Sequence, residues 1–229
     1  MIERDAWTLN DVTLAATGIY PPKVDLTDAP DSIADAVDRI QISGARVFLF
    51  DISTDIHIRV FSAYLLDEKD PSTGIFGGFG ASANPHEAAL RAITESCQSR
   101  CCYLDGARDD LGRRSFYLLK HLYHLSTLKI LDELPYRAQM KAYLPVAFDS
   151  VRQEINFIKT KLIERGLTNL FWKALWAGTV NGQDFVVVKA VSLDLEMPKC
   201  VLWRPRARTF ERLKREREAC STNRSPSDE

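Results

Sequence analysis

The sequence predicts an α+β fold with a mixed or antiparallel sheet and helices packed against it. Apolar residues alternate with polar ones in some segments, as in strands, and recur every three to four positions in others, as in helices. The dipeptide Asn181-Gly182 stands between two apolar runs and is the clearest hairpin signal in the chain. These two kinds of segment alternate along the sequence, which favours one mixed domain over an all-helical or all-strand one.

The individual elements follow from the same patterns. We predict helices over 31–43, 85–103, 113–132 and 150–165, and strands over 46–52, 57–66, 168–180 and 184–193. Residues 51–57 then form the turn between the first two strands. Asp149 is a candidate N-cap for the helix at 150–165, and Gly166 predicts where that helix ends.

The last part of the chain differs in composition from the rest. Residues 206–218 are rich in Arg and Glu, and a Ser-rich polar end follows them. Such a segment predicts a charged helix that has too few apolar residues to anchor itself and frays into disorder. We therefore divide the chain into a domain over 1–205 and a tail over 206–229. Acidic residues interrupt the basic run, which argues against a nucleic-acid-binding arm.

Composition limits the class of protein. A chain of 229 residues with 45% hydrophobic content can build a sizeable core, and its formal net charge of −1 gives no overall attraction to nucleic acid or to an anionic membrane. The N-terminus lacks the pattern of a signal peptide, and no apolar stretch is long enough to span a bilayer. We expect a cytoplasmic protein with no nucleic-acid partner and no membrane association.

The cysteines and histidines do not predict a metal site. Cys97, Cys101 and Cys102 lack Cys-x2-Cys spacing and a nearby histidine pair, so we expect buried thiols in a reducing compartment. His121 and His124 stand three residues apart, but no matching set of ligands lies near them in the sequence. We expect ordinary helical histidines.

A glycine-rich segment precedes the helix at 85–103. Gly77, Gly78 and Gly80 predict a turn, and Asn84 and Pro85 mark the start of the helix. A glycine-rich turn before a helix is a plausible place to hold a nucleotide. It equally suits a turn that only redirects the chain between a strand and a helix.

One face of this helix is strongly polar. Glu87, Arg91, Glu95 and Gln98 fall within roughly 80° of arc, because successive residues of a helix are rotated by about 100°. Two carboxylates, a guanidinium and an amide therefore point the same way and suit a nucleotide with its metal ion. The alternative is a solvated face whose i,i+4 ion pairs each contribute a few tenths of a kcal/mol. The opposite face should contact a core through Ala89, Leu90, Ala92, Ile93 and Cys97.

The order of these residues resembles a known family. The run from Glu87 to Arg100, followed by Gly-Ala-Arg-Asp-Asp at 106–110, resembles the second half of the YcaO domain. The segments 47–56 and 184–191 are similar to strands of that family. The resemblance covers about residues 1–205 and implies a YcaO-like α+β fold.

The N-terminus also takes part in the resemblance. Residues 2–6 resemble the end of a family helix in which two glutamates stand three residues apart, and Glu3 matches the second of them. The first would precede Met1, so we expect an N-terminally truncated domain that needs a complementing N-terminal half. Without the resemblance, Glu3 would be an ordinary acidic residue near a helix start, favoured there by the helix dipole.

The resemblance implies ATP and Mg²⁺ as cofactors. By position, Glu3, Glu87 and Glu95 match magnesium ligands of the family, and Arg91 and Gln98 join them around the nucleotide. Arg91 can instead have a structural role as the counter-ion of the carboxylates. Arg108 suits a loop-ordering ion pair as well as a substrate contact.

The resemblance also implies a reaction. YcaO proteins use ATP to activate a backbone amide of a peptide or protein: a nucleophile adds to the amide carbon and the oxygen leaves as phosphate. A neighbouring side chain then gives an azoline, and an external sulfur source gives a thioamide. Only Pro226 stands near the C-terminus, where many azoline-forming members are proline-rich.

Expected partners are the peptide or protein substrate and a TfuA-like protein or precursor-recognition module. A non-catalytic remnant, a binding subunit and a generic nucleotide-binding scaffold are the alternatives.

Overall fold

The computed structural model describes residues 1–68, 74–105, 129–196 and 207–222. Its helices are α1 (Ile2–Thr17), α2 (Asp31–Ile42), α3 (Pro85–Leu104), α5 (Val151–Ile163) and α6 (Ala207–Thr222), with a 3-10 turn at Met140–Ala142. Its strands are β1 (Lys23–Asp25), β2 (Ala45–Asp51), β3 (Arg59–Asp67), β4 (Ile75–Ser82), β5 (Tyr136–Gln139), β6 (Leu170–Val180) and β7 (Gln183–Ser192). The fold is α+β, as predicted. Most of the helix predicted at 113–132, with His121 and His124, lies outside the described residues, as does Arg108.

The main sheet has five strands in the order β4-β3-β2-β1-β5. Neighbouring strands are antiparallel except for β1 and β5, which run parallel, so the sheet is mixed. Strands β1 and β5 are short and were not predicted, since three or four residues carry little periodicity. Strands β6 and β7 form a separate two-stranded hairpin.

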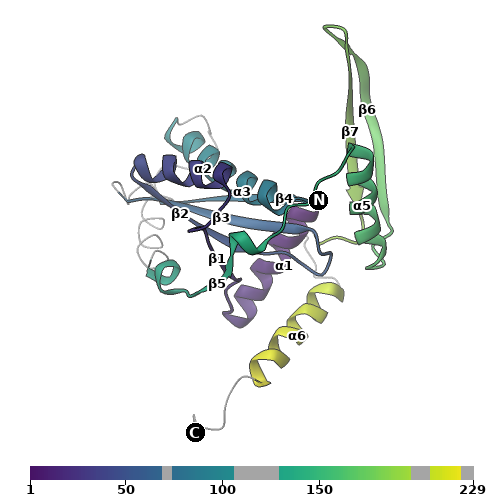
Figure 1. The fold of residues 1–229 in the computed structure, drawn as a ribbon. Helices are drawn as coiled ribbons and strands as arrows, with labels where there is room; N and C mark the ends of the chain where they lie inside the picture. Colours follow the sequence, from purple (N-terminus) through teal and green to yellow (C-terminus); the bar gives the residue numbers. More distant parts are fainter. Residues whose placement is uncertain (69–73, 106–128, 197–206, 223–229) are drawn as a thin grey trace.

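Helices cover both faces of the five-stranded sheet (Figure 1). On one face, α2 and α3 pack against it, and Ala92 and Ile93 of α3 are buried with Leu49 and Phe61 of the sheet. On the other face, α1 lies below β3 and β4, where Ala6 is buried with other apolar side chains. The apolar face predicted for α3 is thus confirmed. Within the described residues, no helix is long and apolar enough to cross a membrane.

The cysteines of α3 differ in their environment. Cys97 is half-buried, and this burial raises the pKa of its thiol, whereas Cys101 is exposed. The prediction of uniformly buried thiols is therefore wrong for Cys101. Cys101 lies on the side of α3 away from the sheet, since Tyr103, two residues later, still packs against Phe76 of β4.

The glycine-rich segment is a strand and not a turn. Residues 75–82 form β4, which pairs with β3 along its whole length. A Cβ at Gly78 would lie 2.2 Å from the backbone nitrogen of Ser96, and one at Gly80 would lie 2.1 Å from the carbonyl oxygen of Ala88. These glycines therefore let α3 approach the strand closely. The prediction of a turn at Gly77, Gly78 and Gly80 is wrong, and the chain bends only at Ala83 and Asn84.

The hairpin and α5 agree with the sequence in most respects. Asn181 and Gly182 both have positive φ, 51° and 76°, as a two-residue hairpin turn requires. Helix α5 ends before Gly166, which adopts a φ of 69°. Its N-cap is Ser150, whose hydroxyl accepts a hydrogen bond from the backbone nitrogen of Gln153, and not Asp149 as predicted.

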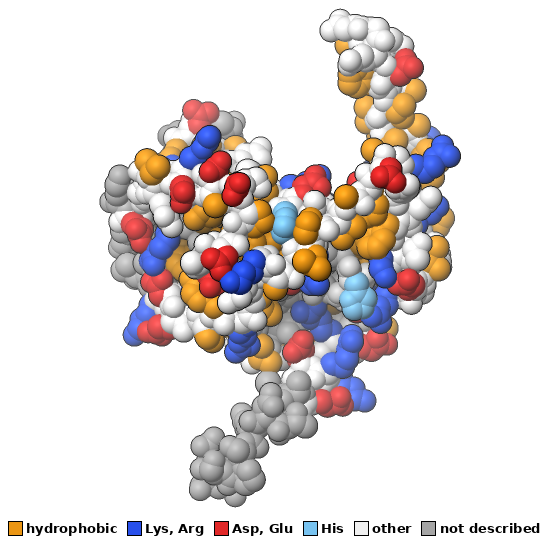
Figure 2. All heavy atoms as spheres, viewed as in Figure 1, with side chains coloured by type: hydrophobic (Ala, Val, Ile, Leu, Met, Phe, Trp, Pro, Cys, Tyr) orange, Lys and Arg blue, Asp and Glu red, His pale blue; other side chains and the backbone are white. Residues whose placement is uncertain are grey.

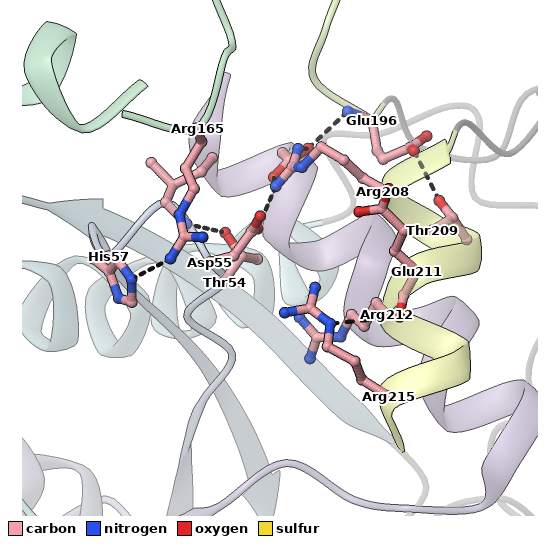
Figure 3. Close-up of polar contacts among 12 residues, drawn as sticks. Thr54, Asp55, His57, Arg165, Glu196, Arg208, Thr209, Glu211, Arg212 and Arg215 are labelled. Atoms are coloured by element: carbon pink, nitrogen blue, oxygen red, sulfur yellow. Dashed lines mark hydrogen bonds and ion pairs between the residues drawn. The ribbon is translucent and has the colours of Figure 1, made fainter. Parts of the chain in front are cut away.

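Helix α6 is anchored, contrary to the sequence prediction. Arg208 donates to both carboxylate oxygens of the fully buried Asp5, at 2.7 and 3.2 Å, and to Asp55 at 2.7 Å. Thr209 donates to Glu196 at 2.8 Å. Figure 3 shows Arg208 reaching from α6 toward Asp55 of the β2–β3 loop, and Thr209 directed toward Glu196. Ion pairs and hydrogen bonds hold the helix where apolar residues are few, and a count of apolar residues does not detect them.

Candidate functional site

The polar face of α3 lies along the free edge of the five-stranded sheet. Strand β4 is an edge strand, so every second backbone group points away from β3 and needs another partner. Glu95 accepts a hydrogen bond from the backbone nitrogen of Phe79 at 3.2 Å, and Arg91 donates to the carbonyl oxygen of Ala81 at 3.2 Å. Arg91 and Glu95, two of the polar side chains predicted from the helical spacing, therefore line this edge together.

Glu87 is held by two donors. Its Oε2 accepts from the Ser82 hydroxyl at 2.8 Å, and its Oε1 accepts from Nη2 of Arg91 at 2.6 Å. The hydrogen bond from Ser82, followed by those from Arg91, lowers the pKa of this carboxyl. Glu87 is therefore an ionised group, and the structural role weighed for Arg91 is the one that its contacts display.

Glu3 of α1 belongs to the same edge. Burial raises the pKa of the Glu3 carboxyl, and the negative charge of Glu95 raises it further, whereas the nearby Arg91 opposes this shift. The carboxylates of Glu3 on α1 and Glu95 on α3, which are far apart in the sequence, thus repel each other in the fold. A cation between them would relieve that repulsion.

Gln98, the last of the predicted site residues, makes fewer contacts than the others. Gln98 lies exposed on α3, and within the described residues its side chain has no hydrogen-bond partner. The described residues also contain no group of three or more His, Cys, Asp or Glu side chains placed to hold a metal ion. The structure therefore brings Glu3, Arg91 and Glu95 together, with Glu87 adjacent, and leaves Gln98 facing solvent.

An aromatic pair flanks the carboxylates and was missed from the sequence. The rings of Trp7 and Phe79 lie 5.4 Å apart, and Trp7 remains 39% exposed. Trp7 follows Glu3 by four residues, so both stand on one face of α1. Residues 2–6 were expected to end a helix, but α1 continues to Thr17 and therefore includes Trp7.

Comparison with known proteins identifies the family of this chain. A family model described as YcaO cyclodehydratase, ATP- and Mg²⁺-binding, matches residues 1–191. The chain belongs to the YcaO family. A protein from the tfuA 3′ region of Rhizobium leguminosarum bv. trifolii is 35% identical over 126 residues, which is 52% of this chain and 30% of that protein.

Two solved structures share the fold. The YcaO protein of Methanopyrus kandleri bound with AMPPCP and Mg²⁺ superposes with a TM-score of 0.64 at 18% identity, over 90% of this chain and 55% of that one. A heterocyclase in complex with substrate and cofactor gives a TM-score of 0.58 at 19% identity, over 82% of this chain and 25% of that one. The likeness confirms a YcaO fold, and this chain spans between a quarter and about half of those longer chains.

The residues at the edge fit the ligand chemistry of the family. Mg²⁺ takes oxygen ligands and is often held by one or two carboxylates together with phosphate oxygens and waters. Glu3 and Glu95 supply two carboxylates. Burial, followed by the charge of Glu95, raises the pKa of Glu3, and a divalent cation would offset the repulsion between the two. An all-protein cage of three ligands is not needed for such a site.

Proposed function

We propose that this chain forms part of an ATP-dependent enzyme that activates a backbone amide of a peptide or protein. The observation that carries the proposal is the pair Glu3 and Glu95, held close at the α3–β4 edge in a chain of the YcaO family. This edge carries the residues that the sequence predicts for ATP and Mg²⁺.

In this proposal, Glu3 and Glu95 hold Mg²⁺, and Glu87 joins them when nucleotide binds. Both oxygens of Glu87 are engaged by Ser82 and Arg91, so metal binding would exchange the contact with Arg91 for one with the metal. The released guanidinium then reaches a phosphate, which is a favoured partner of arginine. Gln98 contributes a neutral contact at the exposed end of the site, and the Trp7 indole offers a face for the nucleotide base.

ATP supplies the phosphoryl group that turns the amide oxygen into a good leaving group. The chain's own residues bind and orient the nucleotide and neutralise its charge.

Thioamide or azoline formation is the proposed outcome, with a TfuA-like protein or precursor-recognition module as partner. The relative from a tfuA region supports the former partner. Since this chain matches 30% of that relative, we propose that the reaction also needs a complementing N-terminal part.

The alternative is a non-catalytic YcaO-like remnant or binding subunit. It is favoured by one observation, that the described residues hold no group of three metal-ligating side chains. In that case Glu95 and Glu87 serve only to hold α3 against the edge of β4, through their contacts with Phe79 and Ser82.

Calorimetric titration with AMPPCP and Mg²⁺ distinguishes the ATP-dependent enzyme from the non-catalytic alternative. The proposal predicts that the chain, alone or with the complementing part supplied, binds the nucleotide only when Mg²⁺ is present. Glu95→Gln should weaken binding about tenfold, which corresponds to about 1.4 kcal/mol. Glu133→Gln, an exposed charge elsewhere, should have no effect. Absence of binding under both conditions would support the remnant.

A further inference from the structure

A second polar cavity lies away from the α3–β4 edge. It has a volume of about 420 Å³ and is enclosed by the second half of α1, the segment after it, the β2–β3 loop, β5 and α6. Its lining includes three arginines from distant parts of the chain together with neutral hydrogen-bonding groups: Arg59, Arg137, Arg212, Asn10, Thr13 and Thr54. Asn10 and Thr13 follow Glu3 by seven and ten residues, which places them about 10–15 Å along α1 from it.

Arg212 is the most buried of the three arginines. Burial lowers the pKa of its guanidinium, so the charge is held at a cost in solvation. Its Nε donates to the Thr13 hydroxyl at 3.1 Å. Within the described residues, its two terminal amino groups have no hydrogen-bond or ion-pair partner. Figure 3 shows this side chain extending from α6 toward α1 and the sheet. Four N–H donors are thus left for a ligand.

Arg59 is fixed in place by its neighbours. Its guanidinium lies 3.3 Å from Asp51 and 5.0 Å from the centre of the Tyr143 ring. Asp51 also accepts from the Tyr143 hydroxyl at 2.7 Å and from the backbone nitrogen of Ser53 at 2.8 Å. The negative charge of Asp51 is therefore spread over several donors and repels an incoming anion less than a free carboxylate would.

The charges around the cavity favour an anion. Three guanidinium groups line the cavity, together with the two carboxylates of Asp51 and Glu216. Asp51 already accepts hydrogen bonds from its neighbours, so Glu216 of α6 is the acidic group that would oppose an anion most strongly. Arg137 on β5 is exposed and lines the cavity. Arginine forks match the oxygens of phosphate and carboxylate groups, and hydroxyl and amide side chains complete such sites.

We propose that this cavity binds an oxyanion, either a small phosphate or carboxylate ion or the acidic side chain of a peptide. The volume suits one such group with its first waters. The site is separate from the proposed nucleotide edge, and its occupation does not require Mg²⁺.

The test uses the whole chain and inorganic phosphate without Mg²⁺, followed by calorimetry or by ³¹P line broadening. Arg137→Gln should weaken phosphate binding about tenfold, because one charge-assisted contact is lost. Glu216→Gln should tighten it, because the remaining carboxylate is removed. Arg152→Gln, which changes an exposed arginine on α5, should leave it unchanged.

A second titration identifies the source of the anion. An acetylated, amidated Asp-Glu peptide that binds with the same pattern of variants, while phosphate does not, would assign the cavity to an acidic peptide side chain. The reverse result would assign it to a small ion. If neither probe binds, or if Arg152→Gln weakens binding as much as Arg137→Gln does, the proposal is wrong. Far-ultraviolet circular dichroism of each variant shows that its fold is retained.

Discussion

The α3–β4 region and the β6–β7 hairpin present apolar side chains in opposite ways. In the first, Ala88, Ala92 and Ile93 are fully buried against the sheet. In the second, large side chains stand in solvent, and Trp172 is 72% exposed. Figure 1 shows the hairpin extending away from the sheet and beside α5, and Figure 2 shows the apolar side chains along it.

The difference shows that apolar composition does not by itself reveal what a strand packs against. The hairpin strands are rich in residues of high β propensity, such as Val and Trp, whereas β4 contains three glycines, two of which lie so close to α3 that no side chain fits between them. The hairpin depends on its own backbone pairing and on its turn. We therefore expect substitutions to be costly in the first region and nearly silent for global stability in the second.

The largest expected effect is a cavity under α3. Ile93→Ala should lower the free energy of unfolding by about 3–4 kcal/mol, because a fully buried side chain is truncated. Leu175→Ala on β6, where the side chain is 58% exposed, should cost less than about 1 kcal/mol. Urea denaturation measures both. Equal losses would show that the hairpin is packed in solution.

The second largest loss of stability is expected where β4 lies in close contact with α3. Gly80→Ala should cost about 2–3 kcal/mol, because its Cβ would collide with the backbone of α3. Gly77→Ala on the same strand should be neutral within about 0.5 kcal/mol, since a Cβ there meets nothing within 4 Å. A stable Gly80→Ala protein would contradict the close approach of α3 and β4.

The hairpin turn predicts a smaller and local effect. Gly182→Ala places a side chain at a φ of 76° and should weaken the turn by about 1 kcal/mol. Amide hydrogen exchange should become faster in residues 170–192 and stay unchanged in β3. Faster exchange in both would show that the hairpin and the sheet unfold as one unit.

Substitution of Glu3 should change stability least, and the sign of the change follows from the raised pKa of its carboxyl. The folded state binds a proton at Glu3 more tightly than the unfolded state, whose carboxyl titrates near its ordinary value of 4.5. This residue therefore lowers stability as the pH rises from about 4.5 through the raised folded value, and the penalty persists at neutral pH. Glu3→Gln should exceed the parent in stability at pH 7, and the difference should shrink on acidification. The opposite sign at pH 7 would contradict the raised pKa of Glu3, which results from burial and then from the charge of Glu95.

Local patterns in the sequence predicted α2, α3, α5 and the hairpin strands, and most of the polar edge, but not α1, of which only residues 2–6 were placed in a helix. The periodicity of 85–103 predicted both faces of α3, and Asn181-Gly182 predicted the hairpin. Other features depend on tertiary contacts that no local pattern contains. Strand β4 was mistaken for a turn because its glycines serve the packing of α3, and α6 was expected to be unanchored because its contact with Asp5 joins distant residues.

The most direct test of the proposed site uses Mn²⁺ in place of Mg²⁺, because both ions prefer oxygen ligands. A paramagnetic ion bound by Glu3 and Glu95 broadens nearby proton signals, and the indole N–H groups of Trp7, Trp172 and Trp176 provide natural reporters. Trp7 lies one turn from Glu3 on α1, whereas the other two lie on the exposed hairpin. With AMPPCP present, substoichiometric Mn²⁺ should remove the Trp7 signal, identified with Trp7→Phe, and spare the hairpin signals. Equal broadening of all three, or an unaffected Trp7, would contradict a metal–nucleotide site at this edge.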